Sequence, residues 1–76
     1  MKLWLISQTE NKEWDTYDRA VVCALDEDAA RKICPAGDYW DSRTWCSSPD
    51  LVAVKEIGLA HPSVPEGVVL ASFKAG

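Results

Sequence analysis

The sequence predicts an α+β fold, a small β-β-α-β-β domain with a mainly antiparallel sheet, one short covering helix and two long loops. Three observations support this prediction. The chain has four separate apolar runs of strand length, and one segment carries the start and stop signals of a short helix. Its 76 residues suffice for only one hydrophobic core, so residues 1–76 are expected to form a single domain.

The first two strands are expected at Lys2–Ser7 and at residues 19–24. The first contains an unbroken apolar run, residues 3–6, which is typical of a central strand covered on both faces. The second holds Val21 and Val22, whose β-branched side chains favour extended backbone. The polar residues 8–18 between the two strands predict a long loop.

A short helix is expected over residues 26–34. Asp26 can cap it by accepting a backbone N–H, and the acidic residues that follow favour the positive end of the helix dipole. Glu27 and Arg31 are spaced to form an ion pair one turn apart. Pro35 prevents the helix from continuing.

The second half of the chain predicts two more strands separated by turns. Residues 36–50 are rich in Gly, Ser and Pro and predict an irregular segment. A third strand is expected at residues 51–57 and a fourth at residues 68–74. A turn-rich connection joins them.

Charge and cysteine content exclude several classes of partner. A formal net charge of −4 argues against direct nucleic-acid binding and against an anionic membrane surface, which both select for Lys and Arg. The apolar run near the N-terminus is too short for a signal sequence or a membrane span. An odd number of cysteines, three, fits a reducing compartment, so a soluble cytoplasmic protein is expected.

The cysteines and the single histidine are residue types that serve in zinc binding and in nucleophilic catalysis. Cys23, Cys34, Cys46 and His61 are the ligand types of a Cys₃His zinc site, but they lie far apart with no CxxC or HxxxH pair. His61 could activate Cys46 or a serine, yet nothing in the sequence brings them together. We therefore expect no metal, no cofactor and no enzymatic activity.

The unusual feature of the sequence is a group of aromatic residues interleaved with carboxylates in the two loops. Such rings are typical anchors of protein interfaces, and the neighbouring carboxylates could complement a basic protein surface. The alternative is that the rings fold back over a thin core. The expected partner-binding residues are Trp14, Asp15, Tyr17, Asp18, Asp38, Tyr39, Trp40, Asp41 and Trp45.

Four stretches of the chain occur together in a known family: Met1 to Gln8 (MKLWLISQ), residues 17–22 (YDRAVV), Ala29 to Arg31, and residues 71–76 (ASFKAG). In these stretches the chain resembles a family of small, mostly uncharacterised proteins of tailed bacteriophages and prophages. The resemblance covers nearly the whole chain and carries no catalytic motif. It implies a shared fold, location in the host cytoplasm, and action by binding, commonly to disarm a host defence system or redirect a host enzyme. No site residue is transferred with it.

The leading hypothesis is a small acidic phage accessory protein that inhibits a host defence system, in the manner of an anti-CRISPR protein, by binding a host protein with a basic surface. One alternative is a sponge that sequesters a nucleotide immune signal by stacking its base on an aromatic ring. In that case the helix start at Asp26 would hold the phosphate, although the acidic residues there would repel it. Another alternative is a structural homo-oligomer that pairs through residues 68–74.

Overall fold

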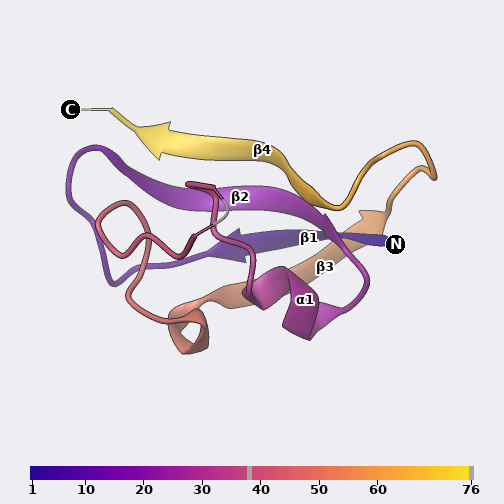
Figure 1. Ribbon diagram of the computed structural model, residues 1–76, viewed down its shortest axis with the longest axis horizontal. Coiled ribbons are helices and arrows are strands. Elements are labelled where there is room, and N and C mark those ends of the chain that lie inside the picture. Colours follow the sequence, from indigo (N-terminus) through magenta and orange to yellow (C-terminus); the bar gives the residue numbers. More distant parts are fainter. Residues whose placement is uncertain (38, 76) are drawn as a thin grey trace.

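The computed structural model describes residues 1–37 and 39–75 and shows a four-stranded antiparallel sheet with one short α-helix (Figure 1). The strands lie in the order β3-β1-β2-β4. The predicted α+β class and the order β-β-α-β-β are confirmed. In chain order the elements are β1 (Lys2–Ser7), β2 (Thr16–Ala24), α1 (Glu27–Arg31), the 3₁₀ helix η1 (Pro49–Leu51), β3 (Ala53–Leu59) and β4 (Gly67–Lys74).

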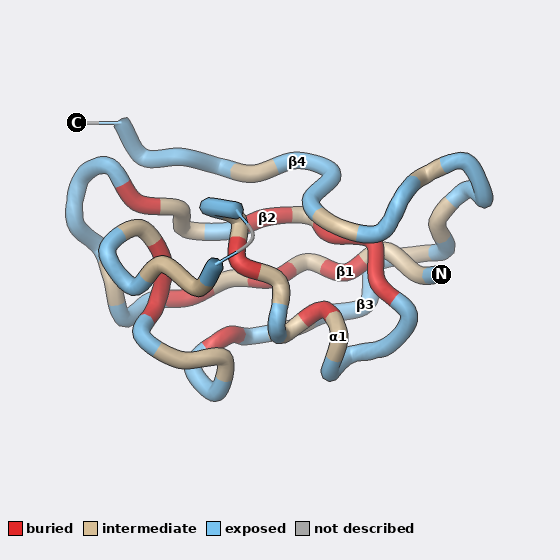
Figure 2. The backbone as a smooth tube through the Cα atoms, viewed as in Figure 1, coloured by how far each residue is buried: buried red, intermediate tan, exposed pale blue. Residues whose placement is uncertain are grey.

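Strand β1 is central, as predicted, but only one of its faces is covered. Trp4 and Ile6 are buried, whereas Leu3 and Leu5, which point to the opposite face, are only half-buried (Figure 2). The expectation that both faces are covered is therefore wrong. The main covering layer lies on the side of Trp4, whereas on the opposite face Cys23 is buried beneath the connection before β4.

Strand β2 begins at Thr16, three residues earlier than expected. Thr16 pairs with Lys74 and Tyr17 pairs with Phe73 across the β2–β4 ladder. Residues 16–18 have no apolar pattern that would predict a strand. Their cross-strand hydrogen bonds with β4 extend β2 beyond its apolar part. Tyr17, expected in a loop, lies in β2.

Helix α1 is capped as predicted but ends earlier. The Asp26 carboxylate accepts a hydrogen bond from the backbone N–H of Ala29 at 2.8 Å, and Glu27 pairs with Arg31 at 3.1 Å. The N–H of Ile33 donates to the carbonyl of Ala30 at 3.2 Å, an i→i−3 bond that tightens the last turn. The expected extension to residue 34 is therefore wrong.

Strand β3 begins two residues later than expected because a 3₁₀ turn precedes it. The Ser48 hydroxyl accepts from the N–H of Asp50, and Pro49 occupies the first helical turn. Both are helix-start signals, and they hold Leu51 outside the strand. Strand β4 begins at Gly67, one residue earlier than expected.

The core lies between the Trp4 face of the sheet and the layer formed by α1 and the irregular segment after it. That segment contributes Cys34, Trp45, Cys46 and Val52, which cluster with the buried side chains of β1 and β2. The Arg31 guanidinium, which donates to the carbonyl of Val52, ties α1 to the same layer. Trp45 is fully buried and is one of the largest side chains of this cluster.

Replacing Trp45 by alanine is expected to unfold most of the domain. A Trp→Ala change in a core costs about 3–5 kcal/mol, which equals the roughly 3–5 kcal/mol of net stability expected of a core this small. Urea denaturation followed by circular dichroism measures the effect. Trp14→Ala, which truncates an exposed ring, is the matched control, and a Trp45→Ala variant as stable as this control would contradict the assignment of Trp45 to the core.

Candidate functional site

The two loops predicted to bind a partner are joined to each other by Asn11. Its side-chain amide donates to the backbone carbonyls of Ser42, Arg43 and Trp45 at 3.3, 3.1 and 3.2 Å. Gln8, which is buried, holds Asn11 in place, because its side chain bonds both the N–H and the carbonyl of Asn11 at 2.8 Å. The first loop is thus fastened to the backbone of the second.

Two further contacts reinforce this junction. Glu10 accepts from the N–H and the hydroxyl of Ser47 at 2.7 and 3.0 Å, and the N–H of Tyr17 donates to the carbonyl of Thr44 at 2.7 Å. Residues 8–18 and 39–47, distant in sequence, therefore form one end of the molecule, at the left of the view (Figure 1). We call these two segments the loop end.

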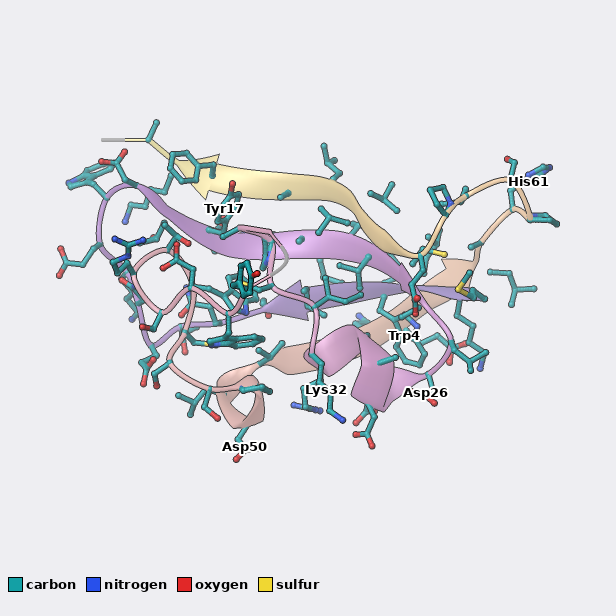
Figure 3. The ribbon with its side chains drawn as sticks, viewed as in Figure 1. Trp4, Tyr17, Asp26, Lys32, Asp50 and His61 are labelled. Atoms are coloured by element: carbon teal, nitrogen blue, oxygen red, sulfur yellow. The ribbon has the colours of Figure 1, made fainter. Side chains whose placement is uncertain are left out.

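The predicted aromatic residues occupy very different environments at the loop end. Trp14 and Tyr39 are 65% and 88% exposed. Trp40 is half-buried and donates its indole N–H to the carbonyl of Cys46 at 2.8 Å. Tyr17, labelled in Figure 3, is also half-buried and packs edge-on against Phe73.

Trp45 is fully buried, so its side chain is not available to a partner. The prediction that it contributes to the contact surface is corrected by its place in the core. For this ring, the alternative that loop aromatics cover a thin core is the right one.

Two of the predicted carboxylates are paired with neighbouring arginines. Asp18 contacts Arg19 at 3.2 Å and Asp41 contacts Arg43 at 3.3 Å. A hydrogen bond from Ser72, together with Arg19, holds the pKa of Asp18 below its usual value. The pKa of Asp41 is lowered by its hydrogen bonds from the backbone and the side chain of Arg43.

The other two predicted carboxylates are less informative. Asp15 is exposed and has a positive φ of 61°, a left-handed conformation that Asp tolerates better than most residues. Asp38 lies outside the described residues. The acidic character of the loop end is therefore partly offset by Arg43 within it and by Arg19 next to it.

Two residues of the loop end's surroundings were missed by sequence reasoning. The ammonium of Lys74 lies 4.8 Å from the centroid of the Trp14 ring and donates to the carbonyl of Lys12 at 3.0 Å. Phe73, packed on Tyr17, is 47% exposed. Only the β2–β4 register brings these residues of the last strand beside the first loop, and no local sequence signal encodes that register.

The structure does not bring together the four residues considered for zinc. Cys23 lies beneath the carbonyl of Val64, 3.8 Å from its sulfur, while Cys34 and Cys46 lie in the core on the other face. His61 is exposed, 2.8 Å from the Ser63 hydroxyl, at the opposite end from the loops (Figure 3). Within residues 1–37 and 39–75, no group of three or more His, Cys, Asp and Glu side chains could hold a metal ion.

Burial makes the Cys46 thiol a poor nucleophile. Burial raises the pKa of this thiol, and its sulfur donates to the carbonyl of Ser48 at 3.3 Å. His61, considered above as a base for Cys46, is at the far end of the molecule (Figure 3). The two do not form a nucleophile–base pair.

No family model, curated protein or solved structure matches this chain. In the described part of the chain no helix is long and apolar enough to cross a membrane. What the loop end offers a ligand is two exposed rings, Trp14 and Tyr39, flanked by carboxylates in weak ion pairs with arginines.

The lowered pKa of Asp18 predicts a defined loss of stability in acid. A carboxyl whose pKa is lower in the folded state contributes stability above its unfolded pKa, and this is lost as pH falls through the folded value. We expect Asp18→Asn to flatten the decline in unfolding free energy below the ordinary pKa of 3.8. The measurement is urea denaturation at a series of pH values.

Glu66→Gln, which removes an exposed carboxylate on the connection before β4, is the control for the loss of one charge. If the unfolding free energy declined equally steeply in acid for Asp18→Asn and for the unaltered protein, the ionised form of Asp18 would not be stabilised in the folded state.

Proposed function

We propose that this protein is a non-enzymatic binding domain that inhibits a component of a host defence system through its loop end. The observation that carries the proposal is the exposure of Trp14 and Tyr39 on two loops that are fastened to each other. Large exposed rings are costly to leave in water and are typical centres of binding energy in interfaces.

The hydrogen bonds of Asn11 and Glu10 favour a rigid binding surface. Binding by free loops costs about 0.5–1.5 kcal/mol for each side chain that becomes ordered. Here Asn11 and Glu10 already hold the backbone of residues 42–47 against the first loop. Less ordering then remains for the moment of binding.

The charges around the rings favour a partner with a basic surface. Asp18 and Asp41, like any aspartate with a pKa at or below 3.8, are ionised at neutral pH. Their ion pairs with Arg19 and Arg43 are solvent-exposed, and such pairs contribute at most about 1 kcal/mol. A partner's arginine or lysine can therefore compete for these carboxylates.

The resemblance to small phage proteins supplies the class of partner. Accessory proteins of that family's size and context are expected to act by binding host components, and a host defence protein with a basic surface fits the charges described above. The acidic residues at the start of the five-residue helix α1, Glu27 and Asp28, disfavour the nucleotide-sponge alternative at that place.

Truncating the two exposed rings is expected to abolish capture of the partner. Trp14→Ala and Tyr39→Ala, alone and combined, are compared with the unaltered chain for retention of host-lysate proteins identified by mass spectrometry. Removing one central anchor costs about 2 kcal/mol or more, a weakening of roughly thirtyfold. Circular dichroism verifies that each variant is folded.

Leu59→Ala is the matched control, because it truncates an exposed apolar side chain in β3, outside the loop end. Retention of the same protein by the double variant, at undiminished affinity, would refute the proposal. Retention of a nucleotide and no protein would favour the sponge.

A structural homo-oligomer is a second candidate function, favoured by the edge strand β4. Val68, Val69 and Leu70 are exposed on this strand, and its only charged residue is the terminal Lys74. The other edge strand, β3, carries Lys55 and Glu56 near its centre, the usual protection against edge-to-edge pairing.

Sedimentation analysis over a wide concentration range tests this second candidate. Pairing through β4 predicts a dimer. Leu70→Lys should convert this dimer to a monomer, because a charged side chain on an edge strand disfavours edge-to-edge pairing. A monomer at all concentrations for the unaltered chain would eliminate the homo-oligomer.

A further inference from the structure

The second surface of interest is the face of the sheet opposite the core. Paired residues of an antiparallel sheet share a face, so the strand register defines rows across this face. The central row consists of Lys55, Leu5, Val21 and Leu70, one residue from each strand. Its three apolar members are half-buried or exposed, and Leu70 is 70% exposed.

The rows on either side differ in character. On one side Leu3 and Cys23 lie between Gly58 and Gly67 at the two edges. This row is open only at its β3 edge, where a Cβ at Gly58 would meet nothing within 4 Å. Cys23 is fully buried beneath the carbonyl of Val64. On the other side the row turns polar, with Ser7, Arg19 and Ser72.

Two hollows join on this face to form a groove. The first, of about 360 Å³, is lined by the apolar residues Leu5, Val21 and Leu70 together with Arg19. The second, of about 550 Å³, shares Leu5 and Arg19 and extends to the loop end, where Lys12 and Asp18 line it together with Lys74. We call this continuous surface the open-face groove.

The open-face groove is basic although the protein carries a net charge of −4. Three basic residues, Lys12, Arg19 and Lys74, line the second hollow, and Asp18 is the one acidic residue among its described lining. Lys55 adds a further cation at the β3 end of the central row. An apolar floor therefore leads directly to a cluster of cations.

We propose that the open-face groove binds an acidic, amphipathic segment of a partner protein. The segment's apolar side chains pack on Leu5, Val21 and Leu70, and its carboxylates pair with Lys12, Arg19 and Lys74. Charge complementarity selects this occupant. A second copy is disfavoured, because packing face to face would bring the cations of the two copies against each other. An anionic membrane is disfavoured, because the protein's net charge of −4 is repelled by it.

This site goes beyond the proposed function, because its apolar floor lies on the sheet face opposite the core and its cations select an acidic partner. Its second hollow borders the loop end, so that Lys12 and Asp18 belong to both surfaces. The loop end favours a basic partner, whereas the groove favours an acidic one. The two tests stay distinguishable, because neither Trp14 nor Tyr39 lines the groove and neither Leu5, Val21 nor Leu70 belongs to the loop end.

The test selects short random peptides displayed on a surface for binding to the full-length chain. Enriched sequences are expected to combine apolar residues with several Asp or Glu. A synthetic copy of one such peptide, added to the ¹⁵N-labelled chain, should shift the resonances of Leu5, Val21 and Leu70. Binding should weaken steeply with added salt.

Two groove variants and two controls make the test specific. Arg19→Gln and Leu70→Ser should each weaken the peptide at least about tenfold. Lys32→Gln, which removes an exposed cation from the layer on the covered face, and Tyr39→Ala should leave its affinity unchanged.

Enrichment of basic or uncharged peptides, or shifts confined to residues 39–47, would overturn the proposal. So would groove resonances that shift with protein concentration alone, which would indicate a second copy, or that shift only with phosphatidylglycerol vesicles.

Discussion

The burial of Trp45 against the sheet is the interaction on which the rest of this structure depends. The only α-helix of the described chain has five residues, too few to cover a four-stranded sheet. The irregular segment after it must therefore supply apolar side chains, and Trp45 is the largest that it buries. Because Trp45 fixes the backbone of its neighbours, the carbonyls of Ser42, Arg43 and Trp45 are in place to accept from Asn11.

Both proposed surfaces follow from this one-sided core. Loop residues that cover the core on one face bring the two aromatic loops together at one end, where Trp14 and Tyr39 stay exposed. On the opposite face the connection before β4 covers Cys23, which leaves Leu5, Val21 and Leu70 uncovered beside the cations of Lys12 and Arg19. A small domain with one main covering layer thus has two chemically different surfaces available for binding.

Local signals predicted much of the fold but little of the site. The apolar runs, the Asp26 cap and Pro35 define the order of elements, because each acts over a few residues. Trp14 and Trp45 both stand in polar loop sequence, and only the non-local bonds of Asn11 and Tyr17 to residues 42–45 decide which ring is buried. The sequence also could not predict which face of the sheet is left open. Residues 3–6 form an apolar run without alternation, and such a run does not show which face is covered.

Hydrogen exchange of a Trp45→Phe variant tests the central role of Trp45 most directly. This substitution keeps an apolar ring but leaves part of the space empty, so it should loosen the segment without unfolding the sheet. If Trp45 organises both loops, the N–H groups of Asn11 and Tyr17 lose protection together with those of residues 44–45, while β1 and β3 stay protected. Unchanged protection of Asn11 and Tyr17, with faster exchange only at residues 44–45, would contradict this role.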